Sequence, residues 1–328
     1  MINNRRRVLR VLAVGSCALA APLSLRANGS ELNLHEWNDT ALGADATIQL
    51  YTDDQLKADQ TLKVVESLLR HYERIFSLYD NQSLASKLNR NGFIDDAPEE
   101  FIELVKLAKS FHDTTDGAFD ISVQPLWNLY QSHFSSMGDG ELSSKIKPVL
   151  DNIGSEKILI SNKNVSFDTN NMAVSFNGIA QGYITDKVSD YLKEQGFTNV
   201  LVDIGEYRAI GPQKNGAPWR IGVLNPFDTV SIFDVLELDG GAVATSGGYG
   251  NQFDGAGQYH HLFDPKTGLS SQLHASVTVK ADDATTADAL STAFSNMSYS
   301  MIESVADQYQ KIEVKIVTHE GDVKTITS

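Results

Sequence analysis

Two stretches of the chain repeat apolar residues at the spacing of a helix face. The first predicts an amphipathic helix over residues 54–76, and its apolar face is formed by Leu62, Val65, Leu69, Tyr72 and Phe76. The second predicts a helix that follows Pro98 and ends before Gly117, with an apolar face of Phe101, Leu104, Val105, Ala108 and Phe111. Each helix should bury that face against the rest of the protein.

Short apolar and β-branched runs predict strands at residues 200–202, 220–223, 276–280 and 313–318. A further helix should run through Asp186, Val188 and Leu192 to Gly196, and another should begin after Thr285 and Thr286. Helices and strands alternate irregularly, and the chain contains no repeat and no Pro- or Ser-rich linker. These features predict an α+β fold, with mixed sheets and packed helices in a single domain of about 300 residues. No GxGxxG motif or Walker loop marks a common nucleotide-binding fold.

The first 27 residues have the pattern of an export signal, and residues 28–328 would form the domain. Four arginines between positions 5 and 10 precede a run of small and apolar residues too short to span a bilayer comfortably. The adjacent arginines resemble a twin-arginine signal, with an ordinary secretory signal as the alternative. Residues 14–17 resemble a lipid-attachment motif at Cys17, although the apolar run continues past Cys17 and so favours cleavage without an anchor. We expect a periplasmic protein, with association at the inner membrane as the alternative.

Charge and cysteine content narrow the function classes. The chain has 27 Lys and Arg against 42 Asp and Glu, a net charge of −15. Without the five arginines of the signal, 22 basic residues face the 42 acidic ones and the charge becomes −20. This balance argues against nucleic-acid binding. Cys17 is the only cysteine, so the chemistry of the domain must use oxygen and imidazole groups.

Three clusters of small and polar residues each allow a structural and a functional interpretation. Tyr79 follows a predicted helix end, in a turn-forming segment, and its ring is also placed to stack on a planar ligand. Residues 117–123, followed by 125–127, form either a helix-to-strand corner or a close backbone approach to a ligand. Residues 177–183 place glycines ahead of a helix, where unpaired amides are able to bind an anion.

A fourth cluster carries most of the titratable chemistry. His260 and His261 precede the turn at residues 264–268, and they are equally typical of a half-exposed strand end. Asp288 and Thr292 are four residues apart on a predicted helix, so the carboxylate and the hydroxyl share one face. Hard oxygen ligands of this kind suit Mg²⁺. The alternative is that Asp288 favours the helix dipole and Thr292 packs inward.

Taken in order, these clusters resemble the ApbE family of FAD:protein FMN transferases from about residue 40 to 295. The matching stretches are residues 76–80, 117–120 with 125–126, 182–183 with 186, 244–247, 261 with 264–268, and 287–292. The resemblance implies FAD contacts at Leu42, Tyr79, Ala118, Phe119, Asp120, Ser175, Gln181 and Leu262. It implies Mg²⁺ ligands at Asp288, Thr292 and the carbonyl of Gly178, with Ser291 close by, and catalysis by His261.

The chain departs from the family pattern at three of these positions. The family usually has Lys where this chain has Gln181, often Asp at Ser175, and often Met at the position that aligns with Leu42. Loss of a lysine charge beside the cofactor should weaken FAD binding or move the phosphate contacts onto metal and backbone.

The function implied is Mg²⁺-dependent transfer of FMN from FAD to a Thr or Ser hydroxyl of an exported or membrane-bound redox protein, with release of AMP. An imidazole is well matched to removal of the hydroxyl proton, and we assign this role to His261, with His260 as second candidate. Two alternatives are a periplasmic FAD-binding or storage protein and a hydrolase that splits FAD into FMN and AMP. The acceptor is not named by the sequence, and the resemblance suggests a protein with an FMN-binding domain, such as a subunit of a sodium-pumping or Rnf-type complex.

Overall fold

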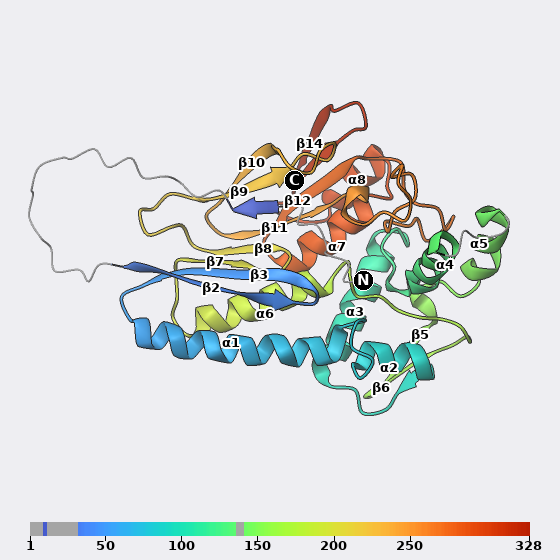
Figure 1. The fold of residues 1–328 in the computed structure, drawn as a ribbon, viewed down its shortest axis with the longest axis horizontal. Coiled ribbons are helices and arrows are strands. Elements are labelled where there is room, and N and C mark those ends of the chain that lie inside the picture. The colour runs from blue at the N-terminus through green and yellow to red at the C-terminus, as the bar shows by residue number, and fades with distance from the viewer. Residues whose placement is uncertain (1–8, 12–31, 136–140) are drawn as a thin grey trace, which may run out of the picture.

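The computed structural model describes residues 9–11, 32–135 and 141–328, and for residues 9–11 it describes only the backbone (Figure 1). The predicted signal at residues 1–27, including Cys17, lies outside the described residues apart from the short strand β1 (Leu9–Val11).

An eight-stranded antiparallel sheet forms the centre of the fold (Figure 1). Its strands follow the order β14-β13-β12-β11-β8-β7-β3-β2. In chain order they are β2 (Asn33–Ala41), β3 (Ala44–Thr52), β7 (Val200–Asp203), β8 (Tyr207–Ile210), β11 (Gly241–Ser246), β12 (Ser276–Ala281), β13 (Glu313–Val317) and β14 (Val323–Thr327). Side chains alternate between the two faces along each strand, so neighbouring residues enter different cores. Val200 and Val202 of β7 face one core, and Leu201 faces the other.

Helices cover one face of this sheet and a second sheet covers part of the other. The long helix α1 (Gln55–Phe76), α6 (Ala180–Glu194) and α7 (Ala284–Phe294) pack on the first face, together with α8 (Tyr299–Ala306). On the second face, β9 (Trp219–Leu224) and β10 (Ile232–Leu238) bury Trp219, Ile221 and Leu236 against β7, β8 and β11. Strand β1 pairs with β9.

A smaller group of elements lies beside the carboxyl end of α1. It contains α2 (Leu84–Asn91), α3 (Glu99–Thr114), α4 (Gln124–Ser135), α5 (Leu142–Leu150) and the three-stranded sheet of β4 (Phe93–Ile94), β6 (Asn164–Phe167) and β5 (Ile158–Ser161). Gly92 ends α2 with a φ of 79°, a left-handed conformation that glycine adopts without strain. Tyr130 of α4 packs against Phe263, so α4 is joined to the loop that follows β11.

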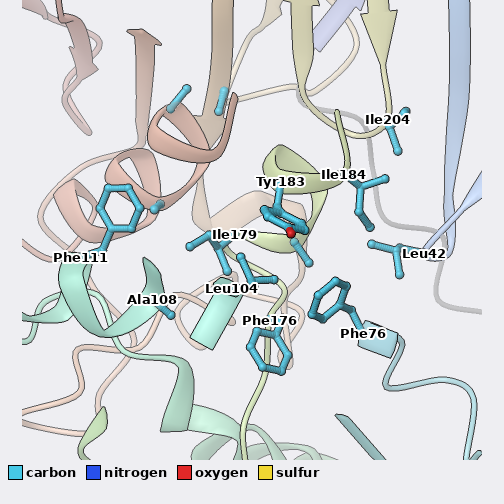
Figure 2. Packing of buried hydrophobic residues seen from close by; sticks show 14 of the residues in the cluster. Leu42, Phe76, Leu104, Ala108, Phe111, Phe176, Ile179, Tyr183, Ile184 and Ile204 are labelled. Atoms are coloured by element: carbon cyan, nitrogen blue, oxygen red, sulfur yellow. The ribbon is translucent and has the colours of Figure 1, made fainter. Parts of the chain in front are cut away.

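An aromatic cluster connects these two parts of the fold (Figure 2). Phe76 at the end of α1 packs edge-on against Phe176 and Tyr183, with ring centroids 5.4 Å and 5.9 Å apart. Phe101 of α3 stacks on Phe76 at 6.1 Å and packs edge-on against Phe176 at 5.5 Å. Because Phe176 and Tyr183 bracket residues 177–182, this packing holds the start of α6 in place.

The α+β fold class predicted from the sequence is confirmed. Helix α1 begins after Asp54, whose carboxylate accepts a hydrogen bond from Lys57 N, and it ends at Phe76 as predicted. The predicted strands at 200–202, 220–223, 276–280 and 313–318 are all present, with ends displaced by one residue. Within the described residues, no helix is both long and apolar enough to cross a membrane.

Two helix starts differ from the prediction. Helix α6 begins at Ala180, so Gly182 lies inside its first turn instead of ahead of it. Helix α7 begins at Ala284, because Asp283 caps it by accepting a hydrogen bond from Thr286 N. The first turn of α6 is completed by Asp288 of α7, a contact that the local pattern does not contain, whereas the Asp283 cap of α7 is a local signal.

Candidate functional site

A cleft of about 1250 Å³, partly open to solvent, lies where the starts of α4 and α6, the middle of α7 and the end of β11 meet. Nine residues that the sequence analysis assigned to the site line it: Phe119, Asp120, Ser175, Gly178, Gln181, His261, Leu262, Asp288 and Thr292. The structure therefore brings together positions that are up to 173 residues apart in the chain, from 119 to 292.

Asp288, Thr292 and Gly178 all line the cleft. Asp288 and Thr292 lie one turn apart on α7, and Asp288 is 4% exposed. Asp288 Oδ2 accepts a hydrogen bond of 3.0 Å from Gly182 N. Gly178 lies so close to α7 that a Cβ at this position would be 2.9 Å from Thr292 Oγ1. A carboxylate, a hydroxyl and a backbone segment without a side chain thus offer hard oxygen donors of the kind Mg²⁺ takes.

Ser291, the fourth residue assigned to the metal site, does not line the cleft. It is 1% exposed, and its Oγ is 2.8 Å from Ser246 Oγ. Ser246 itself lines the cleft and lies 3.4 Å from Thr292 Oγ1. Ser291 therefore reaches the site through Ser246.

The two adjacent histidines have different surroundings. His260 is buried, and its Nε2 donates to Ser271 O at 2.8 Å while its Nδ1 accepts from Leu262 N. Burial lowers the pKa of His260, so this ring is neutral and has a structural role. His261 is half-buried and lines the cleft, and its Nδ1 lies 3.2 Å from Asn251 O. A proton on Nδ1 satisfies that carbonyl and leaves Nε2 as the basic atom of His261.

The carboxylate of Asp120 is fully engaged within the protein. It accepts hydrogen bonds from the backbone and hydroxyl groups of both Ser122 and Ser155, at 2.6–3.0 Å, and its Oδ2 lies 3.1 Å from His112 Nδ1. Burial acts to raise the pKa of Asp120, but the hydrogen bonds from His112, Ser122 and Ser155 outweigh it and lower the pKa. The contact with Asp120 raises the pKa of His112. The implied FAD contact of Asp120 must therefore use its backbone.

His112, Asp120 and Glu156 are also close enough to hold a metal ion, since one donor atom of each lies within 4.8 Å of the others. His112 Nε2 lies 3.7 Å from a Glu156 carboxylate oxygen. The contact with Asp120 raises the pKa of His112, which favours the protonated ring between the two carboxylates, and a protonated imidazole has no lone pair for a metal. We interpret this group as an ion-pair cluster.

Ala118 and Ser175 are each held by a hydrogen bond through their backbone. Ala118 does not line the cleft, and its carbonyl accepts a 3.4 Å bond from Asn296, whose amide also donates to Phe263 O at 2.9 Å. The segment before Phe119 is thereby tied to the one that follows Leu262. Ser175 N donates to Ile121 O at 2.7 Å, which joins the loop before α6 to the turn before α4.

Leu42 and Tyr79 line a smaller hollow of about 240 Å³ beside the cleft. Gln181 and Asn177 border both spaces. Leu42 has a φ of 49°, which is unusual for a residue with a side chain, and Glu73 accepts a 3.0 Å bond from its amide. Tyr79 is 61% exposed, so its ring is accessible for stacking.

Several cleft residues were not identified from the sequence. They are Gln124, Trp127, Asn177, Glu206, Thr245, Ser246 and Asn251. Thr245 and Ser246 lie in the stretch 244–247 that matched the family pattern, and Trp127 directly follows the matching residues 125–126. Glu206 follows Gly205, which has a φ of 93° and no room for a side chain beside Gln181. The sequence signal for the turn between β7 and β8 was therefore a glycine directly before an acidic residue.

The described residues that line the cleft include no Lys and no Arg. Glu206 and Asp288 contribute carboxylates, whereas Lys266 is paired with Asp116 and Arg208 with Asp186. An anionic ligand in this cleft requires another source of positive charge.

The chain is similar in sequence and in fold to known proteins. The model of the ApbE family matches residues 42–316. The FAD:protein FMN transferase of Vibrio cholerae serotype O1 is 30% identical over 303 residues, which cover 88% of each chain, and that of Haemophilus influenzae is 28% identical over 305 residues, covering 87% of this chain and 86% of the relative. The crystal structure of the ApbE protein from Thermotoga maritima has a TM-score of 0.78 at 30% identity, covering 89% of this chain and 96% of that chain. The flavin transferase ApbE from Vibrio cholerae has a TM-score of 0.76 at 28% identity, covering 90% and 97%.

Proposed function

The chain belongs to the ApbE family and is a flavin transferase, and from this premise we propose that it uses Mg²⁺ to move FMN from FAD to a Thr or Ser hydroxyl of an exported or membrane-bound redox protein. AMP is the other product. The observation that carries the proposal is the placement of Asp288, Thr292 and Gly178 in the same cleft as His261. The oxygen donors of Asp288, Thr292 and Gly178 suit a divalent cation, and the imidazole of His261 suits proton removal.

The residues present fit Mg²⁺. Asp288 supplies the formal charge, Thr292 a hydroxyl, and Gly178 a backbone carbonyl at a position where a side chain would collide with Thr292. When bound, the ion offsets the charge of the diphosphate and of the departing AMP. The described residues that line the cleft include no Lys or Arg, so few other groups are able to supply the positive charge. Gln181 gives a neutral amide in place of the family lysine.

His261 is the proposed base. The acceptor oxygen forms a bond to the phosphorus nearer the flavin, and the bond from that phosphorus to the bridging oxygen breaks. The hydroxyl proton passes to His261 Nε2, because Nδ1 is directed to Asn251 O. Asn251 thereby fixes both the tautomer and the ring orientation.

The acceptor and the location are part of the same proposal. The basic start and apolar run of residues 1–27 support export, and the periplasm is the compartment that follows. The name shared by the relatives implies a protein acceptor. We propose an acceptor with an FMN-binding domain, in a membrane redox complex.

The test measures where the FMN and AMP halves of FAD are found after the reaction. The full chain is incubated with FAD, Mg²⁺ and a panel of exported FMN-binding domains, including any encoded beside its gene. Each domain is compared with a version whose acceptor Thr or Ser is replaced by Ala. We expect AMP release and a flavin adduct that survives denaturation, on the intact domains only.

Other outcomes identify the alternative functions. Free FMN and AMP without an adduct across the panel would establish a hydrolase, with water in place of the acceptor hydroxyl. Unchanged FAD bound to folded protein would establish a storage protein. Adduct formation without Mg²⁺ and in the presence of a chelator would refute the metal requirement.

A further inference from the structure

The contact between α6 and α7 repeats once per helical turn, with the chains running in opposite directions. Gly178 lies against Thr292, Gly182 N donates to Asp288 Oδ2, and Asp186 accepts from Ala284 N. Each step moves four residues forward on one segment and four back on the other. The proposed metal site is therefore one end of a row of three pairs, and the Asp186 pair is the other end.

Asp186 binds the amino end of α7 with both carboxylate oxygens. Oδ1 accepts from Ala284 N at 2.8 Å, and Oδ2 accepts from Thr285 N at 2.8 Å and from Thr285 Oγ1 at 2.5 Å. Asp283 binds the next amide, that of Thr286, from within its own helix segment. The first amides of α7 therefore bind two carboxylates. Asp186 of α6 accepts from Ala284 N and Thr285 N, and the Asp283 cap accepts from Thr286 N.

The middle pair fixes the distance between the helices. A Cβ at Gly182 would overlap Ala284 O and lie 2.8 Å from Asp288 Cβ. The two helices therefore touch through Gly182, and α7 cannot slide past α6 without separating from it. A change at the Asp186 end is transmitted through a rigid helix to Asp288 and Thr292.

Arg208 of β8 holds Asp186 in its orientation. Its Nη1 donates to Asp186 Oδ1 at 2.9 Å and lies 3.0 Å from Asp190 Oδ1. Asp190 is one turn further along α6, and its side chain is 56% exposed. Asp190 shares the cation with Asp186, which makes it a matched control.

We propose that Asp186 is a positioning residue for the metal site: by binding Ala284 and Thr285 it sets the register of α7 on α6, and so the spacing of Asp288 and Thr292 from Gly178. This inference rests on the proposed function, because it assumes that Mg²⁺ binds at those three residues. Mg²⁺ demands near-ideal octahedral geometry at short distances, whereas Ca²⁺ accepts longer and more variable ones. A loosened register should therefore weaken Mg²⁺ more than Ca²⁺.

The experiment measures metal binding in the full chain. MgCl₂ or CaCl₂ is titrated into protein with FAD, and binding is followed by the change in flavin fluorescence, which does not require turnover. Asp186→Asn replaces one acceptor oxygen by an NH₂ group that faces N–H donors. We expect Mg²⁺ affinity to fall at least about tenfold and Ca²⁺ affinity less than about threefold.

Two controls separate positioning from loss of structure. Asp190→Asn removes a partner of Arg208 without touching α7 and should leave both affinities within about twofold. Asp283→Ala removes the side-chain cap of α7 alone, so it should lower the melting temperature while the ratio of Mg²⁺ to Ca²⁺ affinity stays constant. A ratio that shifts equally in Asp283→Ala and Asp186→Asn would overturn the inference.

Asp186→Glu decides the question if Asp186→Asn does not fold, because it keeps the charge beside Arg208 and moves the carboxylate by one methylene. It should shift the ratio in the same direction. The inference fails if the folded Asp186 variants keep the wild-type ratio while Asp288→Asn weakens Mg²⁺. If Asp288→Asn itself leaves Mg²⁺ affinity unchanged, the proposed metal site is wrong and the inference falls with it.

Discussion

Two regions of the molecule each contain a histidine and a buried aspartate that lines the cleft, and they use these residues in different ways. In the first, His112 and Asp120 lie 3.1 Å apart and bind each other. In the second, His261 and Asp288 are each oriented by a backbone group, Asn251 O at 3.2 Å and Gly182 N at 3.0 Å. Mutual pairing neutralises the first two groups and makes them structural. His261 and Asp288 each have a neutral backbone group as one partner, and the proposal assigns them to the proton and the cation.

The comparison also shows that burial alone does not identify a functional carboxylate. Asp120 is 7% exposed and Asp288 is 4% exposed. The difference lies in the partners, since Asp120 is surrounded by a cation and by the donors of Ser122 and Ser155. We therefore expect substitutions in the first region to affect stability and substitutions in the second to affect catalysis.

The largest effect should come from His261. His261→Ala removes the proposed base and should lower kcat by about 10²- to 10⁴-fold, while FAD affinity stays within about threefold. Steady-state AMP release and equilibrium FAD titration measure the two quantities separately. Equal losses of affinity and turnover would make His261 a cofactor contact and remove the distinction from His112.

Asp288→Asn should come next. Loss of the charged ligand should raise the Mg²⁺ concentration for half-maximal activity about 100-fold, with Thr292→Val shifting it by about tenfold because only a neutral ligand is lost. Activity titrated against Mg²⁺ measures both. An unchanged curve for Asp288→Asn would place the metal elsewhere and leave Asp288 as a structural carboxylate like Asp120.

Asp120→Asn should act on stability. It removes the charge beside His112 and places an NH₂ group among hydroxyl and amide donors, so the free energy of unfolding should fall by about 3 kcal/mol. Urea denaturation measures the change, and Ser155→Ala, which removes one donor, should cost about 1 kcal/mol. A variant as stable as wild type would show that the pair carries no net stability.

The smallest effect is a pH dependence. The pKa of His112 is raised by its bond to Asp120, so its contribution is complete below the ordinary pKa of about 6.5 and is lost as pH rises through the raised value. Wild type should exceed His112→Gln in unfolding free energy by about 1.5 kcal/mol near pH 6, and the gap should shrink toward pH 9. Burial lowers the pKa of His260, so His260 contributes a pH dependence of opposite sign to the unfolding free energy. Both proteins contain His260, so the difference between them cancels that contribution. A gap that widens with pH would contradict the ion-pair assignment.

Local pattern determined the secondary structure. The apolar face from Leu62 to Phe76 predicts α1 because residues three and four apart share a helix face in any environment, and Asp54 caps the helix through a bond to Lys57, three residues away. The start of α6 was misplaced because its first turn is completed by Asp288 of α7, and the start of α7 was misplaced by a few residues although Asp283 is a local cap. Asp186 binds Ala284 and Thr285 across 98 and 99 residues of chain.

For the site, too, some features follow from the sequence and others only from the tertiary structure. The sequence determined which residue types occur in which motif, and the order of those motifs sufficed for the family and for a set of candidate positions. It did not determine that Asp120 would meet His112 and Ser155, that His260 would be buried beside its half-buried neighbour, or that Glu206 would enter the cleft. The protonation and the accessible atoms of a titratable group depend on the dielectric and on partners within a few ångströms, and packing supplies those partners from distant parts of the chain.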